Sequence, residues 1–196
     1  MSFTISIYCP HCARYTALSE ASTQHHGPCI WKKSTVETWW IGICNSCQGP
    51  VLVQNLQEKV GSKMYPTPLP SETDERIPDG IRIDLIESKL CFSAHAYRGS
   101  TVLACRAIQS TRLDKGATTK DLMKQIDELF GKGIITADLK EWAHVIRWVG
   151  NDAAHPNKDV VTVDDATDIL ELCEQFLHTI YVAPAIAKER RELRGR

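Results

Sequence analysis

The sequence predicts a mostly α-helical protein in which a small β-rich module precedes a helical domain. Three observations support this: two Cys-x-x-Cys pairs lie within the first 47 residues, a proline-rich stretch follows, and apolar residues then recur with helical spacing. The expected divisions of the chain are a cysteine-rich module over 1–62, a linker over 63–78, a helical domain over 79–183 and a charged C-terminal tail over 184–196.

The composition is that of a globular protein. Of the 196 residues, 43% are hydrophobic and 24% are charged. No apolar run approaches the ~20 residues that span a bilayer, and the N-terminus lacks the features of a signal peptide. We therefore expect a cytoplasmic protein without a membrane segment. The net charge of −1 argues against bulk DNA binding through a positive coat, although a local basic patch remains compatible with it.

The first 60 residues have strand-like patterns. Apolar and polar residues alternate over 3–8, the segment 36–43 is rich in β-formers, and 51–53 follows a Gly-Pro turn. Four prolines then fall among polar residues within 65–78, a density that no helix tolerates. This segment is predicted to be extended.

Two helical regions are expected next, over about 81–98 and 100–113. Gly99 is expected to separate them, and Gly116 to end the second.

Threonine caps are expected for the following two helices. Thr119 would cap a third helix that stops near 131–133, and Thr136 a fourth that Pro156 ends. Their apolar faces are predicted to contain Leu122, Ile126, Leu129, Phe130, Leu139, Trp142, Ala143 and Ile146.

A fifth helix should begin at Thr162, which forms a capping-box pattern with Asp165. We expect Pro184 to interrupt this helix and the tail beyond it to be frayed. The predicted buried stripe comprises Ala166, Ile169, Leu170, Cys173, Phe176, Leu177 and Ile180.

The two cysteine pairs predict a metal site. Cys9 and Cys12 are followed, after 31 residues, by Cys44 and Cys47. Each Cys-x-x-Cys turn aims two sulfurs at one point, and two such turns complete the tetrahedral four-sulfur shell that Zn²⁺ prefers. A closed shell has no open position for water, so the predicted zinc is structural. The metal would also stabilise a module too small for a large core.

Other roles for these cysteines stay open. His11, His25, His26 or Cys29 could supply a substitute ligand, iron could replace zinc, and the pairs could serve thiol redox chemistry. The remaining cysteines fall in helical apolar patterns and are expected to be buried thiols: Cys91, Cys105 and Cys173.

Aromatic and basic residues of this module permit two interpretations. Trp31, Lys32, Lys33, Trp39 and Trp40 could form a surface for nucleic acid. The simpler interpretation, which we favour, is that the tryptophans pack over the metal turns and the linker.

A polar stripe is predicted on the fourth helix. Arg147, Asn151 and His155 recur every fourth residue and would therefore share one face. An arginine, an amide and an imidazole suit phosphate binding, and the helix C-terminus would raise the pKa of His155, a candidate acid toward a leaving oxygen. Alternatively, Asn151 and His155 only close the helix, and Arg147 pairs with Asp152 or an acid of the fifth helix.

These segments resemble a known family. The stretches AYRGSTVLACRAIQ, DLMKQIDELFGKGIITADL, RWVGNDAAHP and VTVDDATDILELCEQFLHTIY, within about 83–181, are similar to the bacterial "domain of unknown function 4145" family. A CPHC…CNSC zinc ribbon often precedes that domain. The family is grouped with the HEPN (higher eukaryote and prokaryote nucleotide-binding) superfamily, so the resemblance implies a HEPN-like helical bundle preceded by a small β-rich zinc ribbon.

The resemblance also implies a function. Many HEPN proteins are metal-independent endoribonucleases of phage-defence or toxin systems, and their motifs meet across a homodimer groove. Carried over, Arg147 would hold the scissile phosphate, His155 would assist proton transfer, and Asn151 would position the RNA or the histidine. We therefore expect a homodimeric, RNA-binding, HEPN-like protein with ribonuclease chemistry.

The chain departs from the HEPN pattern in three ways. Seven residues separate Arg147 from His155, apolar Trp148 follows the arginine, and the family's R-A-L-E pattern loses its acid at Arg106-Ala107-Ile108-Gln109. Arg106 could still approach the site, but we expect it to pair only with a neighbouring helix. The alternative function is a non-catalytic dimeric adaptor or regulator whose zinc ribbon binds a protein or nucleic-acid partner.

Overall fold

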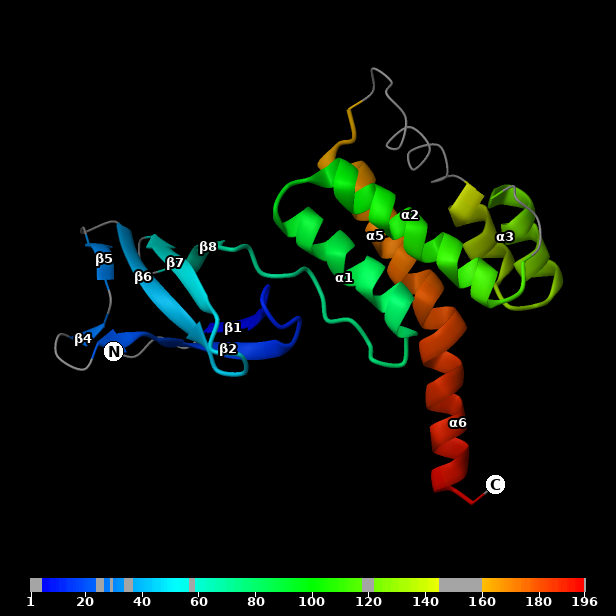
Figure 1. The fold of residues 1–196 in the computed structure, drawn as a ribbon, viewed down its shortest axis with the longest axis horizontal. Coiled ribbons are helices and arrows are strands. Elements are labelled where there is room, and N and C mark those ends of the chain that lie inside the picture. The colour runs from blue at the N-terminus through cyan, green and yellow to red at the C-terminus, as the bar shows by residue number, and fades with distance from the viewer. Residues whose placement is uncertain are drawn as a thin grey trace. The chain divides into compact units, whose positions relative to one another are not determined.

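The computed structural model describes residues 5–23, 27–28, 30–33, 37–56, 59–117, 122–144 and 160–195 (Figure 1). It forms two compact units, Met1–Glu72 and Thr73–Arg196. Their boundary falls inside the segment 63–78 that we expected to be a linker. Among the described residues, no helix combines the length and the apolar character needed to cross a membrane.

The first unit is built on an antiparallel sheet. The order of its strands is β1-β2-β6-β7-β8, and β5 pairs with β6 beside this path. The strands are β1 (Ile5–Tyr8), β2 (Tyr15–Glu20), β5 (Ile30–Lys33), β6 (Glu37–Cys44), β7 (Pro50–Leu56) and β8 (Lys59–Tyr65). A separate pair consists of β3 (Ser22–Thr23) and β4 (Gly27–Pro28).

One face of the sheet packs a small core. Its largest member is the fully buried Trp40, whose indole donates a hydrogen bond to Asn55 Oδ1 at 3.3 Å. Asn55 Oδ1 also accepts from the N–H of Gly61 at 2.9 Å, which joins β7 to β8. The other members of the core are Ile7, Cys9, Leu18, Cys44, Val51 and Val53.

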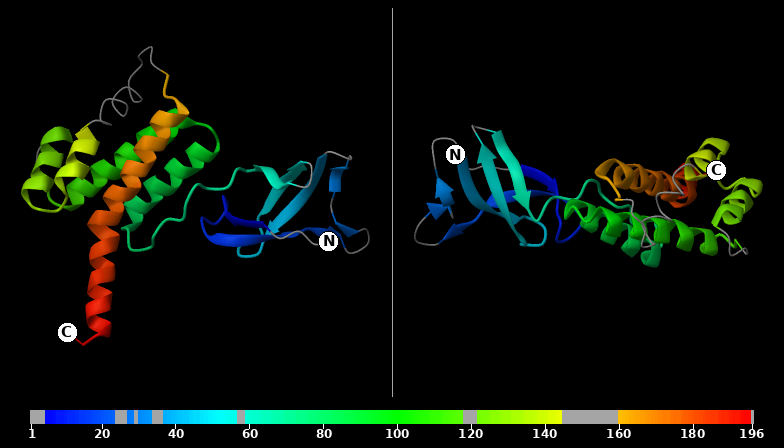
Figure 2. Two further views of the ribbon diagram at one scale, coloured as in Figure 1. Left: turned by 180° about the vertical axis from the view of Figure 1, so that it is seen from behind. Right: turned by 90° about the horizontal axis from the view of Figure 1, so that it is seen from above.

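The second unit is helical. Its helices are α1 (Asp79–Ser93), α2 (Tyr97–Asp114), α3 (Leu122–Gly131), α5 (Val163–Leu177), the π-helical turn η1 (His178–Val182) and α6 (Ala183–Leu193). Residues 137–144 are also helical. Figure 2 shows α1 and α2 alongside α5, with α6 continuing beyond them.

The expected break between the first two helices is wrong in position. Helix α1 ends at Ser93, and His95 has a positive φ of 60°. The N–H of Ala96 bonds to Cys91 O, and that of His95 to Phe92 O, which is a Schellman termination. Gly99 lies inside α2, where an added Cβ would be 3.3 Å from Cys91 Sγ. Gly99 therefore allows the two helices to approach each other and does not separate them.

The expected interruption at Pro184 is also wrong. The chain stays helical from Val163 to Leu193, and the N–H of Ala183 reaches back to His178 O in the π turn. A proline ring normally clashes with the carbonyl four residues earlier. The wider π turn relieves that clash, and Pro184 then lies in the first turn of α6, where its missing N–H matters little.

The Thr136 and Thr162 caps and the buried stripe of α5 are confirmed, whereas Thr119 lies outside the described residues. Thr162 and Asp165 form the reciprocal capping box, and Thr136 Oγ1 accepts from the N–H of Leu139 at 3.2 Å. All seven predicted residues of the stripe are buried, whereas Phe130, expected on a buried face, is 41% exposed beneath the Lys140 ammonium.

Candidate functional site

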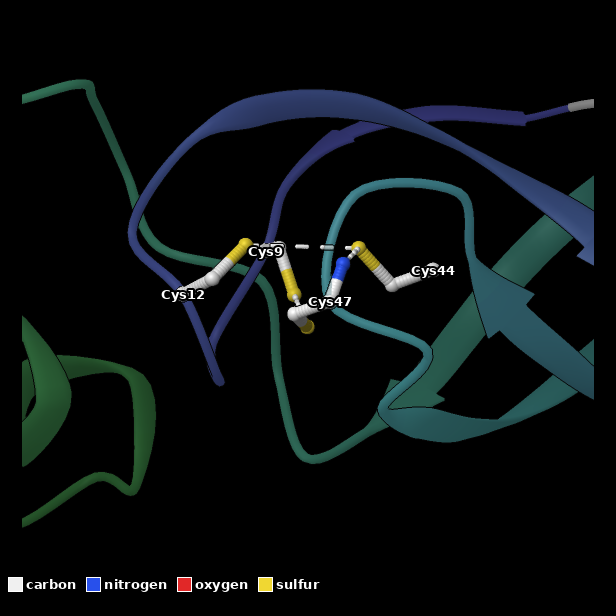
Figure 3. A group of neighbouring side chains, drawn as sticks. All are labelled: Cys9, Cys12, Cys44 and Cys47. Atoms are coloured by element: carbon white, nitrogen blue, oxygen red, sulfur yellow. Dashed lines mark hydrogen bonds between the residues drawn. The ribbon is translucent and has the colours of Figure 1, made fainter.

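Four cysteine thiols meet at one end of the sheet. Cys9 follows β1, Cys12 lies in the turn before β2, Cys44 ends β6, and Cys47 lies in the turn before β7. Strands β2 and β6 are neighbours, with Leu18 opposite Cys44, so pairing brings the two turns together. Figure 3 shows the four side chains converging.

The geometry of the sulfurs fits one metal ion. All four ligand atoms lie within 4.8 Å of one another. The Sγ atoms of Cys9 and Cys47 are 3.8 Å apart, and those of Cys12 and Cys44 are 4.0 Å apart. A tetrahedron with metal–sulfur bonds of ~2.3 Å has edges of about 3.8 Å, whereas a disulfide needs about 2.05 Å. The set therefore has the spacing of a four-thiolate metal site, and its cysteines are free.

Backbone N–H groups surround two of the sulfurs. Cys44 Sγ accepts from the N–H groups of Ser46 and Cys47 at 3.4 Å, and Cys9 Sγ accepts from that of His11 at the same distance. Burial by itself would raise the pKa of the Cys44 thiol. The hydrogen bonds made by its sulfur outweigh the effect of burial and lower this pKa to about 6. Burial dominates at Cys9 and raises its pKa to about 12. In the metal-free protein, Cys44 is thus the readier thiolate, and a cation would favour ionisation of all four.

Both cysteine turns close in the same way. The N–H of Ala13 bonds to Cys9 O, and that of Gln48 bonds to Cys44 O, both at 2.9 Å. Ala13 and Gln48 each follow the second cysteine of a pair and have positive φ values of 53° and 62°. Sequence reasoning missed these two residues because neither alanine nor glutamine signals a left-handed backbone.

His11 is turned away from a ligand role. Its Nε2 lies 2.9 Å from the O atom of Pro50, the first residue of β7. Its ring covers Gly49, where an added Cβ would be 2.5 Å from Cδ2. His11 therefore links the two cysteine turns. The other substitute ligands that we considered, His25, His26 and Cys29, lie outside the described residues.

The tryptophans of this unit have different environments. Trp40 is buried, whereas Trp39 is half-buried, donates a hydrogen bond to Glu37 and stacks on Tyr65 with ring centroids 6.2 Å apart. The proposed basic-aromatic surface begins at Trp31. This residue lies in β5 together with Lys32 and Lys33. In the backbone register, Lys32 stands opposite Trp39.

The predicted polar stripe falls outside the part of the chain that the structure describes. Arg147, Asn151 and His155 lie outside the described residues, as do Trp148 and Asp152. Arg106, the other cation considered for this site, pairs with Asp84 of α1 across a distance of 3.3 Å from Nε to Oδ2. Its expected pairing with a neighbouring helix is confirmed.

A comparison with protein families identifies the helical unit. The family model described as domain of unknown function (DUF4145) matches residues 87–195. The chain belongs to the DUF4145 family. No curated protein and no solved structure matches the chain. The DUF4145 match extends through α6, so the charged C-terminal segment is part of the family domain.

The DUF4145 domain holds charged residues that sequence reasoning did not single out. Lys89 of α1 is fully buried and reaches Glu174 Oε1 of α5 at 2.7 Å and Thr73 Oγ1 at 2.9 Å. Arg112 is 1% exposed, and burial lowers its pKa to about 10. The sequence gives little signal for either position: Lys89 is followed at i+3 and i+4 by Phe92 and Ser93, and Arg112 by Lys115 and Gly116.

The three cysteines of the helices differ in exposure. Cys173 is fully buried, as expected, whereas Cys91 and Cys105 are half-buried. Burial raises the pKa of Cys105 to about 11 and also raises that of Cys173. Both thiols are therefore protonated at neutral pH and are poor nucleophiles.

Proposed function

We propose that Cys9, Cys12, Cys44 and Cys47 bind one Zn²⁺ ion with a structural role. The separations of 3.8 and 4.0 Å between sulfurs of different turns carry this proposal. With four protein ligands the shell is complete, so the ion holds the sheet together and activates no water. It supplies folding free energy to a unit whose core is small.

Metal analysis of purified protein tests the zinc proposal. We expect one zinc per chain, lost in Cys44→Ser and kept in the matched control Cys91→Ser, which changes a half-buried thiol of α1. Iron in place of zinc would be evident from its visible absorbance. A protein with two disulfides in these turns, or with no bound metal, would overturn the proposal.

For the helical domain, we propose an HEPN-like activity: it binds RNA and cleaves it without a catalytic metal. Support comes from the Arg147, Asn151 and His155 pattern together with the family match. Arg147 would hold the scissile phosphate. The 2′-oxygen would attack phosphorus and release its proton to water. The bond to the 5′-oxygen would break as His155 protonates that oxygen, leaving a 2′,3′-cyclic phosphate and a 5′-hydroxyl.

A cleavage assay on zinc-loaded protein tests this activity. Divalent metal is omitted from the buffer rather than chelated, so the proposed zinc stays in place. We expect RNA cleavage that falls at least ~100-fold in Arg147→Ala and His155→Ala but not in His178→Gln, which changes an exposed histidine of η1. If wild type and His155→Ala leave RNA equally intact across substrates of varied sequence, the nuclease proposal is overturned.

A second candidate function is a dimeric, non-catalytic adaptor whose zinc ribbon binds a protein or nucleic-acid partner. The Arg106–Asp84 ion pair favours the adaptor, because Arg106, the other cation considered for the RNA site, is paired with an acid of its own chain. The seven-residue spacing of Arg147 and His155 favours it too. In this case a partner captured by the protein would bind equally well to the Arg147→Ala and His155→Ala variants.

A further inference from the structure

The C-terminal helices form one long rod. Helices α5, η1 and α6 are continuous over 31 residues, which corresponds to a length of about 46 Å. The first half is packed in the bundle, whereas none of the eleven residues of α6, all of them described, is buried. Figure 1 shows α6 extending past the other helices of its unit. A projecting helix of this kind leaves most of its surface available to a partner.

The outward side of α5 is acidic. Asp164, Asp168 and Glu171 are exposed and follow one another at helical spacing, opposite the buried stripe. Gln175 and His178 continue the same exposed line toward η1.

The outward side of α6 is basic. Glu189 marks its inward side, because its carboxylate binds the Arg76 guanidinium of the segment before α1 at 2.9 and 3.0 Å. Arg190 and Arg194 lie about 100° and 140° around the helix from Glu189 and so point away from their own chain. The extra residue of the π turn rotates α6 by about 100°, which brings these arginines into line with Asp164 and Asp168.

The acidic and basic halves of this rod are arranged to complement a second copy. Asp164 and Arg194 are centred on Thr179, and so are Asp168 and Arg190. We propose that the α5–η1–α6 rod docks antiparallel against the same rod of a second chain, with a two-fold axis near Thr179. Each Asp164 then faces Arg194 of the other chain, and each Asp168 faces Arg190, so one contact pattern occurs twice.

Apolar residues reinforce the two ends of this pairing. Val163, beside Asp164, is 45% exposed, and Leu193, beside Arg194, is 78% exposed. In the antiparallel arrangement Val163 of one chain approaches Leu193 of the other. Exposed ion pairs alone contribute little affinity, so these contacts supply attraction while the charges fix register and direction.

Charge distribution favours a second copy over a nucleic acid as occupant. Residues 183–196 contain five Lys or Arg and two Glu, whereas 73–182 contain 13 Lys or Arg and 18 Asp or Glu. A polyanion following the rod would meet repulsion from the acidic half, but a second antiparallel rod meets attraction at both halves.

Charge reversal tests the interface in the full-length chain. We expect wild type to form dimers by light scattering. Asp164→Lys with Asp168→Lys makes the rod basic at both ends, and Arg190→Glu with Arg194→Glu makes it acidic at both ends. Each double variant alone should weaken dimerisation by roughly 100-fold. An equimolar mixture of the two should restore a 1:1 heterodimer, which also shows that both variants are folded.

A matched control reverses two exposed acids away from the rod, Asp138→Lys with Glu141→Lys, and should leave the dimer unchanged. A wild type that stays monomeric at ~100 µM, or a dimer that is indifferent to both double variants, would overturn the interface. So would failure of the mixture to restore pairing. The proposed interface assumes the homodimer that is common to both proposed functions, and it does not depend on RNA binding. RNA cleavage is therefore assayed on wild type and His155→Ala, and the oligomeric state on the charge-reversal variants, so that failure of one proposal is distinguishable from failure of the other.

Discussion

At the scale of single residues, each of the two cysteine turns depends on one residue in a backbone conformation that ordinary side chains disfavour. Ala13 and Gln48 both adopt a left-handed conformation, which costs a non-glycine residue about 1–2 kcal/mol. Neither conformation is accidental, because the N–H of each residue closes its turn onto the first cysteine of the pair.

Gln48→Gly should therefore stabilise the sheet unit. Glycine removes the left-handed cost but loses more conformational entropy on folding, so we expect a net gain of about 0.5–1 kcal/mol in free energy of unfolding. Denaturant titration of the metal-loaded protein measures it. Gln48→Val, which is branched at Cβ, should change the stability in the opposite direction. A loss of stability in Gln48→Gly would contradict the strain argument.

Gly49→Ala should destabilise the same unit. The new Cβ would fall 2.5 Å from the His11 ring, so the ring must move and its contact with Pro50 O must break. We expect a loss of about 1–3 kcal/mol and weaker metal retention against a chelator. The double variant with His11→Ala removes the clash and should cost less than the sum of the single changes. Strict additivity would show that the ring is not the obstacle.

At the scale of elements, the sequence predicted helix starts and ends correctly where a residue acts through its own neighbouring backbone. The Thr162–Asp165 box and the Thr136 cap began helices where predicted, because a threonine oxygen satisfies free N–H groups wherever a helix starts. Gly116 ended α2 as expected, in the same hydrogen-bond pattern that His95 makes after α1.

Errors arose where a residue's role depends on distant partners. Gly99 looks like a helix breaker in sequence, but it is a contact point for Cys91. Strand β8 lies partly within the expected linker, because its pairing with β7 cannot be read from its own residues. For the candidate metal site, all four cysteines were identified from spacing, whereas the His11 link needed the fold.

The contact between η1 and α2 gives a pH-dependent prediction. Tyr181 Oη donates to Asp114 Oδ2 at 2.7 Å, and this hydrogen bond, with Lys115, holds the pKa of Asp114 below its ordinary value. A carboxyl group whose folded pKa is lowered stabilises the fold above its unfolded pKa of about 3.9 and loses that effect as the pH falls.

Tyr181→Phe should therefore cost about 1 kcal/mol at pH 7, a value reduced because the Asp114 side chain is 44% exposed. The difference from wild type should shrink below about pH 4 as Asp114 becomes protonated in both proteins. Denaturant midpoints between pH 3 and 7 measure this trend. Asp114→Asn should remove most of the pH dependence of the difference, and a constant difference across the range would assign the Tyr181 effect to packing alone.

At the scale of the whole molecule, the chain folds around two cores of unequal size. Among the described residues, the sheet unit has a cluster of seven buried residues, and two of them, Cys9 and Cys44, belong to the four-thiol site. In the described part of the helical unit, the cluster has 20 buried residues and includes none of those thiols. A metal at the four-thiol site should therefore matter for one unit and not for the other.

Chelation should consequently unfold the sheet unit while the helical unit persists. Without the ion, the two cysteine turns lose the ligand that they share, and the apolar core of the sheet unit that remains is small. Hydrogen exchange resolved by peptide measures this: β6 and β7 should lose protection with a strong chelator, and α2 and α5 should keep theirs. Cys44→Ser should reproduce the pattern without a chelator, and Cys91→Ser should not. Simultaneous loss of protection in both units would mean that they fold as one, because separate cores allow one unit to open while the other stays closed.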